Sequence, residues 1–337
     1  MIAPVFHAWE RRLAVVDQNR HIRPFEWGLD WLGLDPDTPD PNAAVESYVR
    51  DVMRDTDAFF QPPPYRDFSL TRDRLEFESA SHTPYPENNV VSLRVFPGRN
   101  RKPGQPKRAV LILPQWNANA GGHVGLCEAL AYFGITAIRL VLPYHEHRRP
   151  ADLKRSEFIV GTNVGRTLHA NRQAVLDARR AIDWLETQGY DRIGIMGTSL
   201  GSCLAMLTMC HDARVRTGAF NHVSPYFADV VWNGLSTEHV RAGLDGHITL
   251  EQLRHAWMPI SPWPFIERVK TRKILLIYAR YDLTFPVDLS RSFLKEFDRR
   301  GVPHRTAVLP CGHYTTGKTP FKYIDGYWLI SHLLRNL

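Results

Sequence analysis

The feature that most constrains the fold is an alternation of short apolar runs with longer amphipathic segments through the C-terminal two-thirds of the sequence. Runs with the length and composition of buried strands are RAVLILP (108–114), TAIRLVLP (136–143), RIGIMG (192–197), VRTGAFNHVS (215–224), KILLIYAR (273–280) and HRTAVLP (304–310). The segments 164–189 and 321–336 carry apolar residues at helical spacing. Because strands that alternate with helices pair in parallel, with helices on both faces, the sequence predicts an α/β fold with a mostly parallel central sheet.

Two segments do not follow this alternation, and they set the predicted domain boundaries. Residues 1–70 combine scattered tryptophans and prolines with a helix expected over 43–59, which indicates an N-terminal helical extension and a linker. The α/β domain is expected over 71–337. Within it, residues 225–267 are rich in aromatic residues and are too long for one connecting helix. We interpret this segment as a cap insertion.

Composition and charge exclude several classes of protein. The chain has 337 residues, of which 44% are hydrophobic, and this is enough to bury a large core. Its formal net charge is +7, but the basic residues are spread out and form no block of five like charges. We therefore expect no nucleic-acid partner.

Cysteine usage and the N-terminal residues predict a cytoplasmic location. The cysteines form no C-x-x-C pair and have no zinc-ligand spacing, so we expect them to be reduced. Charged residues interrupt the N-terminus at Glu10, Arg11 and Arg12, which is unlike a signal peptide. No uncharged apolar stretch is long enough to span a membrane.

A serine between two glycines stands at the junction of a strand-like and a helix-like run, in RIGIMGTSLGSCLAML (192–207). A strand, Gly-x-Ser-x-Gly and a helix in this order are typical of a nucleophile elbow. Ser199 would lie on a tight, strained turn, and side chains at Gly197 or Gly201 would clash where the helix folds back on the strand. In the alternative interpretation, Ser199 only caps the helix.

A serine nucleophile needs a base and an acid that orients the base, and two loops are placed to supply them. Asp282 lies just after the strand 273–280, and His313 lies in CGHYTTG after the strand 304–310. Their order after Ser199, acid and then histidine, is the order expected in this architecture. The alternatives are a turn or helix-cap carboxylate for Asp282 and an exposed loop position for His313.

Main-chain N–H groups are the expected donors to an oxyanion. One is the N–H of Leu200 at the start of the helix, and a second is expected from QWNANAGGH after the strand 108–114, at Gln115 or Trp116. We prefer Trp116, although its indole would serve equally well to cover the core.

These motifs resemble those of the α/β-hydrolase superfamily. The resemblance covers roughly residues 70–337 and rests on GTSLG, YARYDLTFP and PCGHY, while LPYHEHRRP and GRTLHANRQAVLDARRAIDWL are similar to dienelactone-hydrolase and acetyl-xylan-esterase-like members. It implies that Ser199 is the nucleophile, His313 the base and Asp282 the acid. The chain departs from the family pattern in the oxyanion loop, which lacks the HGGG form, and in residues 225–267.

Further candidates belong to the substrate pocket: His145, Tyr226, Trp232 and Trp263. The aromatic side chains would form the wall of an apolar acyl pocket or, in the alternative interpretation, the core of the cap. His145 belongs to the sequence HEH, which lacks a third, separated metal ligand. We expect no metal and no organic cofactor.

Together these features predict a serine hydrolase that cleaves a small carboxylic ester through a Ser-His-Asp triad and an acyl-enzyme. The net charge and the basic residues Arg148 and Arg149 leave room for an anionic or lipid-like ester. An amidase or peptidase, an acyltransferase and a non-catalytic binding protein on the same scaffold are the alternatives. The sequence indicates no oligomeric state.

Overall fold

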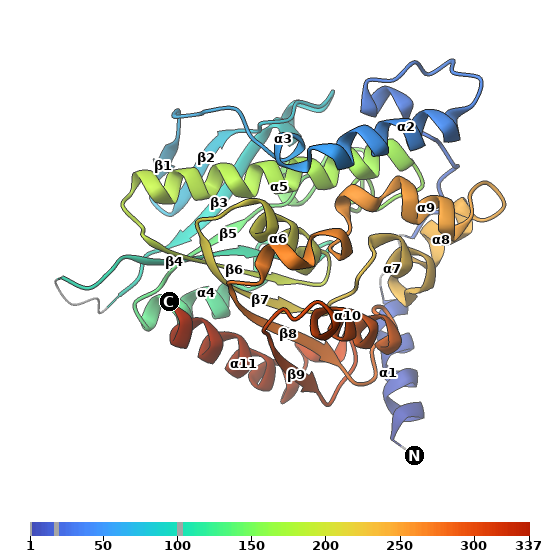
Figure 1. The fold of residues 1–337 in the computed structure, drawn as a ribbon. Coiled ribbons are helices and arrows are strands. Elements are labelled where there is room, and N and C mark those ends of the chain that lie inside the picture. The colour runs from blue at the N-terminus through green and yellow to red at the C-terminus, as the bar shows by residue number, and fades with distance from the viewer. Residues whose placement is uncertain (1, 17–19, 100–103) are drawn as a thin grey trace.

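One nine-stranded sheet forms the centre of the protein (Figure 1). The computed structural model describes residues 2–16, 20–99 and 104–337. The strands lie in the order β1-β2-β3-β5-β4-β6-β7-β8-β9. Their bounds are β1 (Ser69–Thr71), β2 (Arg74–Glu78), β3 (Val90–Phe96), β4 (Arg108–Leu113), β5 (Thr136–Leu140), β6 (Arg192–Thr198), β7 (Val215–Asn221), β8 (Lys273–Ala279) and β9 (Arg305–Leu309).

The sheet is parallel over most of its width. From β5 through β4, β6, β7 and β8 to β9, every neighbouring pair is parallel. By contrast, β1, β2 and β3 form antiparallel pairs, and β3 also pairs antiparallel with β5. Parallel neighbours need a crossover connection, which helices supply here. The predicted α/β fold with a mostly parallel sheet is confirmed.

Helices cover both faces of this sheet (Figure 1). The helices are α5 (Val164–Thr187), α6 (Leu200–His211) and α10 (Val287–Arg299) on one face, and α4 (Val124–Tyr132) and α11 (Phe321–Asn336) on the other. On β4, Leu111 packs into the core with the first group, and Ile112 packs into the core with the second. Successive strand side chains point to opposite faces, and both are apolar here because each face is covered.

The N-terminal residues form several short helices that pack on the α/β domain. These are α1 (Ala3–Val15), η1 (Leu29–Leu32), α2 (Pro41–Arg54) and α3 (Thr56–Phe59). The helix predicted over 43–59 is interrupted at Asp55, whose side chain accepts a hydrogen bond from the Ala58 N–H and begins α3. Val49 and Phe60 are buried in the same core as α5 and α6.

Residues between β7 and β8 form a series of short helices in place of a single crossover helix. They are α7 (Phe227–Asn233), η4 (Leu235–Thr237), α8 (Glu238–Leu244), α9 (Leu250–Ala256), η5 (Met258–Ile260) and η6 (Trp263–Val269). We refer to residues 225–267 as the cap. Trp257 of the cap is fully buried, and its indole N–H donates to Val164 O at the start of α5. The cap is thus attached to the face of the sheet that α5 covers.

The remaining 3-10 helices of the described chain lie in loops: η2 (Pro86–Asn89), η3 (Glu146–Arg148) and η7 (Thr315–Gly317). Across residues 2–16, 20–99 and 104–337, no helix combines the length and the apolar character needed to cross a lipid bilayer.

Candidate active site

Ser199 lies on a sharp turn between β6 and α6. Its backbone has φ 57° and ψ −121°, a strained conformation for a residue other than glycine. Hydrogen bonds hold the turn on both sides, because the Ser199 N–H donates to Asn221 O at 2.8 Å and the Ser202 N–H donates to Ser199 O at 2.8 Å. The serine lines a cavity at the carboxyl end of the sheet.

The two positions Gly197 and Gly201 must be glycine because β6 and α6 pack closely at the turn. A Cβ on Gly197 would lie 2.0 Å from Gly201 O, and a Cβ on Gly201 would lie 2.1 Å from Leu113 O. Both distances are far below van der Waals contact, so neither position accepts a side chain without moving the backbone.

Asp282 and His313 come together from two different loops, which follow β8 and β9. The His313 Nδ1 lies 3.1 Å from Asp282 Oδ2. Asp282 Oδ1 accepts hydrogen bonds from the N–H groups of Thr284 at 2.8 Å and Phe285 at 2.7 Å. Because an ionised carboxylate only accepts hydrogen bonds, His313 Nδ1 carries a proton, and the lone pair of the neutral ring is on Nε2. This is the tautomer that a general base needs.

The surroundings of Asp282 keep its carboxyl group ionised. Burial raises the pKa of this group, but the attraction to His313 and the hydrogen bonds from His222 and His313 outweigh burial and hold the pKa well below its usual range. Asp282 is only 3% exposed, so its charge acts on the two imidazole rings rather than on solvent.

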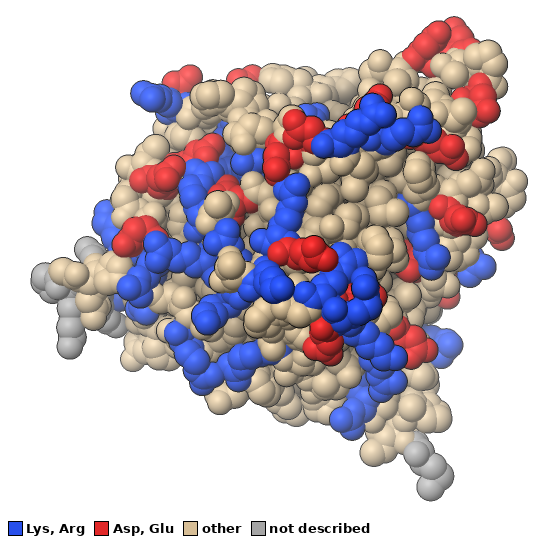
Figure 2. Space-filling view, viewed as in Figure 1, with Lys and Arg blue, Asp and Glu red and all other residues tan. Residues whose placement is uncertain are grey.

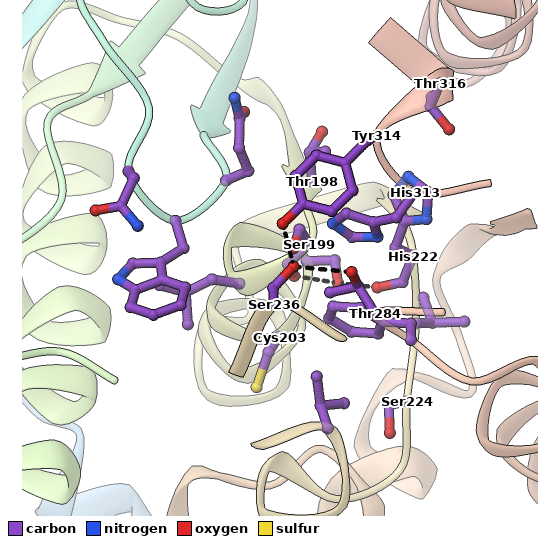
Figure 3. A pocket seen from close by; sticks show the side chains of 18 of the residues that line it. Thr198, Ser199, Cys203, His222, Ser224, Ser236, Thr284, His313, Tyr314 and Thr316 are labelled. Carbon is purple, nitrogen blue, oxygen red and sulfur yellow. Dashed lines mark hydrogen bonds between the residues drawn. The ribbon is translucent and has the colours of Figure 1, made fainter. Parts of the chain in front are cut away.

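Ser199, His222 and His313 line the same cavity (Figure 3). Within the described chain, the Ser199 hydroxyl makes no hydrogen bond to His313. Contacts between nucleophile and base are often longer without substrate than in the reacting complex. The fold therefore brings the candidate nucleophile and the candidate base to one cavity.

His222 is a functional candidate that the sequence analysis missed. Its Nδ1 lies 2.7 Å from Asp282 Oδ2, which is closer than the Nδ1 of His313. The strand predicted over 215–224 would have placed His222 inside the sheet, but β7 ends at Asn221. His222 therefore begins a loop at the carboxyl edge, and a correct strand end was the signal that could have found it.

The N–H groups expected to bind an oxyanion lie on two segments that line the cavity. Leu200 is the first residue of α6, where a helix leaves its N–H groups without an intrahelical partner. In the loop after β4, the Asn117 N–H donates to His145 Nε2 at 2.9 Å. The N–H groups of Gln115 and Trp116 make no hydrogen bond within the described residues, so they remain available to a ligand.

His145 supports this loop from behind and is not part of the cavity wall. It is 1% exposed, and its Nδ1 lies 2.9 Å from Pro143 O while its Nε2 accepts the Asn117 N–H. These partners place the proton on Nδ1. Burial lowers the pKa of His145 to about 4, so the ring is neutral near pH 7.

Trp116 forms part of the cavity wall and is fixed on several sides. Its indole N–H donates to Ser156 O at 2.8 Å. The ring stacks on His239 with a centroid distance of 6.0 Å, and the Arg155 guanidinium carbon lies 5.2 Å from the ring centroid. These contacts hold the indole of Trp116 in place at the cavity wall.

The cavity has a volume of about 530 Å³ and a mostly apolar wall. Its apolar side chains include Leu126, Val160, Met206, Phe227, Val231 and Phe293. Of the predicted pocket aromatics, Tyr226 lines the cavity, whereas Trp232 and Trp263 do not. Trp263 stacks on the Tyr226 ring at a centroid distance of 5.5 Å, and Trp232 packs against Arg241 at 5.4 Å. Trp263 thus supports the wall from outside through Tyr226.

His222, Asp282 and His313 also offer two imidazole nitrogens and a carboxylate oxygen within 4.8 Å of one another. These are ligand types that zinc accepts. However, the distances of 2.7 and 3.1 Å from one carboxylate oxygen to the two rings are hydrogen-bond distances. The arrangement is that of one acid holding two imidazoles.

The two basic residues that the sequence suggested for an anionic substrate, Arg148 and Arg149, do not reach the cavity. Arg148 is fully buried, where it pairs with Asp177 at 2.8 Å and donates to Asn88 O at 2.7 Å. Arg149 is exposed and is not part of the cavity wall. On the face seen in Figure 2, Lys and Arg side chains are spread over the middle and lower parts with acidic side chains among them. Arg148 and Arg149 therefore give no support to an anionic substrate, whereas Arg155 and Lys322 line the cavity.

The loop that carries His313 is braced by the N-terminal helix α1. The buried Glu10 carboxylate accepts hydrogen bonds from the N–H groups of Tyr314 and Thr315 at 2.9 Å each, and from the Thr315 hydroxyl at 2.8 Å. The Tyr314 hydroxyl lies 2.7 Å from Ser236 Oγ of the cap (Figure 3). Residues from the extension and the cap thus hold the histidine loop together.

Comparison with known sequences gives one family match. The family described as Alpha/beta hydrolase domain containing 18 matches residues 126–228, a stretch that includes Ser199 and His222. No curated protein matches the sequence.

Solved structures share the fold at low sequence identity. An acylaminoacyl peptidase of Pyrococcus horikoshii has a TM-score of 0.60 at 15% identity, over 81% of this chain and 42% of its own. A puromycin-hydrolyzing peptidase of Mycobacterium tuberculosis has a TM-score of 0.58 at 16% identity, over 74% and 37%. Dipeptidyl peptidase 4 of Porphyromonas gingivalis has a TM-score of 0.54 at 13% identity, over 81% and 36%.

The chain spans less than half the length of these peptidases, so the likeness concerns one part of each. The chain therefore has the α/β-hydrolase fold, and its residues 126–228 match an α/β-hydrolase family.

Proposed function

We propose that this protein is a serine hydrolase that cleaves carboxylic esters. Ser199 Oγ attacks the ester carbonyl carbon while His313 Nε2 takes the hydroxyl proton, and Asp282 stabilises the imidazolium that forms. The carbonyl oxygen becomes an oxyanion beside the N–H of Leu200 and that of Gln115 or Trp116. The C–O bond to the alcohol breaks, and His313 returns the proton to the departing alcohol.

The acyl-enzyme is then hydrolysed by the same groups. His313 takes a proton from a water molecule, whose oxygen attacks the acyl carbon, and Ser199 leaves with the proton back on its oxygen. The steps use only side chains, main-chain N–H groups and water.

One observation carries this proposal: a buried, ionised Asp282 orients His313 at the edge of the cavity into which the strained Ser199 turn faces. A strained serine alone would suit a helix cap, and an Asp–His pair alone would suit a structural contact. The convergence of all three from separate strand ends favours covalent catalysis.

The cavity wall favours an ester with an apolar acyl group. A volume of about 530 Å³ with apolar side chains around most of its surface suits a small molecule or an acyl chain of moderate length. Burying such a chain contributes about 0.8 kcal/mol per methylene group, so chain length should strongly affect kcat/KM until the cavity is full.

A peptidase or amidase is the second candidate. It is favoured by the structural neighbours, which are described as acylaminoacyl peptidase, puromycin-hydrolyzing peptidase and dipeptidyl peptidase 4. The same groups would act, but the leaving amine is harder to expel than an alcohol and depends more on protonation by His313.

Matched substrates separate the two candidates. We expect hydrolysis of p-nitrophenyl esters from acetate to palmitate with a clear optimum of chain length, and slower hydrolysis of the p-nitroanilides with the same acyl groups. Ser199→Ala should abolish both activities, and Asp282→Asn should lower kcat by about 10³-fold or more. Asp288→Asn, at an exposed carboxylate near the start of α10, is the matched control. Faster turnover of the anilides than of the esters would reverse the order of the candidates.

A further inference from the structure

We infer that His222 is a positioning residue of the active site, which shares Asp282 with His313 and fixes the orientation and the effective charge of that carboxylate. The inference rests on the proposed triad, because it assigns a role to the acid of that triad. The arrangement would extend the chain of contacts from Ser199, His313 and Asp282 to a second, buried histidine.

The hydrogen bonds of Asp282 account for all its acceptor positions. Oδ1 accepts the two main-chain N–H groups of Thr284 and Phe285, and Oδ2 accepts Nδ1–H from both His222 and His313. A carboxylate offers about four such positions. The bond from His222 is the shorter of the two to Oδ2, at 2.7 Å against 3.1 Å. His222 therefore donates to the same carboxylate oxygen as the proposed base, and from a shorter distance.

The backbone around His222 is fixed in a conformation that a non-glycine residue seldom adopts. Its φ is 60°, its N–H donates to Ile277 O at 2.9 Å, and its carbonyl oxygen accepts the Ser202 hydroxyl at 2.7 Å. Such strain persists only where surrounding contacts enforce it, and it is found often at functional sites. Ser202 lies on the first turn of α6, so the conformation of His222 is linked directly to the nucleophile elbow.

The two histidine rings are in contact, and this restricts their charges. Their centroids are 4.2 Å apart, and the Phe285 ring stacks on His313 at 5.4 Å and lies 6.3 Å from the His222 ring. Burial and the nearby His313 lower the pKa of His222, although Asp282 opposes this. His222 is thus a neutral donor, and only one of the rings becomes a cation during the reaction.

The charged and titratable groups that face His222 are Asp282 from the loop after β8 and His313 from the loop after β9. The neutral His222 donates a hydrogen bond to Asp282 Oδ2 and so partly offsets the negative charge that His313 experiences. Loss of that donor would direct the full carboxylate charge at His313 and favour its protonated form. The acidic limb of activity would then move to higher pH, because more alkaline conditions are needed to free the base.

Two substitutions separate this role from simple packing. Asn places Nδ2 at the same position in the side chain as Nδ1 of histidine, can donate to Asp282, and tolerates positive φ. Leu fills a similar volume and cannot donate. His222→Leu and His222→Asn are therefore the test pair, with His255→Leu at an exposed position on α9 as the control.

The measurement is the rate at which a fluorophosphonate probe labels Ser199 between pH 5 and pH 9, with thermal unfolding as a check on folding. We expect the acidic limb of His222→Leu to lie about one pH unit higher than that of the wild type, with a maximal rate about tenfold lower, as the loss of one charged hydrogen bond implies. His222→Asn should keep the wild-type limb and lose about threefold in rate or less. The inference would be overturned if the acidic limb of His222→Leu lay at the same pH as that of the wild type. It would also be overturned if the acidic limbs of His222→Leu and His222→Asn shifted by the same amount.

A second measurement uses the unmodified protein and so does not depend on the folding of the variants. In protein labelled with ¹⁵N-histidine, NMR should show His222 as a neutral imidazole protonated at Nδ1, with His313 also protonated at Nδ1. An unprotonated Nδ1 on His222 would contradict the hydrogen bond to Asp282. This result stands whether or not Ser199 reacts with the probe, so failure of the triad proposal and failure of the His222 inference are distinguishable.

Discussion

At the scale of single residues, strained backbone gathers around the cavity. Ser199, His222 and His123 all have positive φ, at 57°, 60° and 65°, and all line the cavity. Each lies in a loop that follows the carboxyl end of a strand. In open parallel sheets, ligands bind at this end of the strands. Strain of this kind is retained when neighbouring contacts enforce it. Strained backbone conformations therefore occur at residues that line the cavity of the proposed active site.

Asp325 of α11 provides a pH-dependent prediction at this scale. Its carboxylate accepts a hydrogen bond from Asn221 Nδ2 at 2.9 Å, and burial raises its pKa from 3.8 to about 7. Between these two values the folded protein holds a proton that the unfolded chain has released, so the free energy of unfolding falls as the pH rises through this window. We expect Asp325→Asn to raise the melting temperature by a few degrees at pH 8 and to leave it unchanged near pH 4.

Thermal unfolding of both proteins across this pH range measures the effect. The exposed Asp288→Asn is the control and should not change the slope of stability with pH. A variant that is less stable than the wild type at pH 8 would show that the ionised carboxylate contributes a favourable contact that the structure does not contain.

Local sequence patterns predict some residues of the candidate site but not others. Ser199, Asp282 and His313 stand at the ends of strongly apolar strands, and local spacing is enough to single them out. His222 and Glu10 carry no such pattern. Each gains its place only from the packing of segments that are distant in the sequence, and a contact over 60 or 304 residues leaves no local signal.

At the scale of elements, α1 behaves as part of the active-site architecture. Its Glu10 side chain supplies acceptors to three donors of the loop that follows His313. Without these acceptors, the N–H groups of Tyr314 and Thr315 would stay buried and unpaired. Because each such group costs about 1 to 3 kcal/mol, the loop depends on α1 for its conformation.

We therefore expect Glu10→Ala to lower the free energy of unfolding by about 2 to 4 kcal/mol and to slow labelling of Ser199 more than tenfold at temperatures where the protein is folded. Urea denaturation and probe labelling measure the two effects. Arg11→Gln, at the exposed neighbouring position, is the control. If Glu10→Ala destabilised the protein but Ser199 were still labelled at the wild-type rate, Glu10 would contribute to stability without positioning His313, which would contradict this expectation.

Helices and strands could be predicted from the sequence where their apolar residues recur at a regular spacing. The long helix predicted over 164–189 corresponds to α5 (Val164–Thr187), because its apolar face repeats regularly over many turns. The helix predicted over 43–59 was wrong at one point, since the Asp55 side chain caps a new helix and interrupts the first. Periodicity continues across such a cap, and only the capping hydrogen bond reveals the break.

At the scale of the whole molecule, the N-terminal extension shares a core with the α/β domain. Leu29, Val45, Val49 and Phe60 are almost fully buried in the cluster that contains the α5 and α6 side chains. Each of these side chains contributes about 1.5 to 3 kcal/mol when it is removed from water. The sequence pattern predicted an extension and a linker, but it did not show how much of the core this extension supplies.

We expect a chain without residues 1–68 to lose cooperative unfolding, because the removed side chains leave an apolar face of α5 and the cap open to solvent. Calorimetry of the truncated and full chains compares them directly. The full chain should unfold in one transition that includes the extension. A monomeric truncated protein with a cooperative transition near that of the full chain would show that the α/β domain folds without it.

The central claim is that Ser199 is an activated nucleophile, and reaction with a fluorophosphonate probe followed by mass mapping of the modified peptide tests it most directly. We expect stoichiometric modification at Ser199 in the wild type, none in Ser199→Ala, and strong slowing in His313→Ala and Asp282→Asn. Absence of modification in the folded wild-type protein, or modification at another residue, would contradict it.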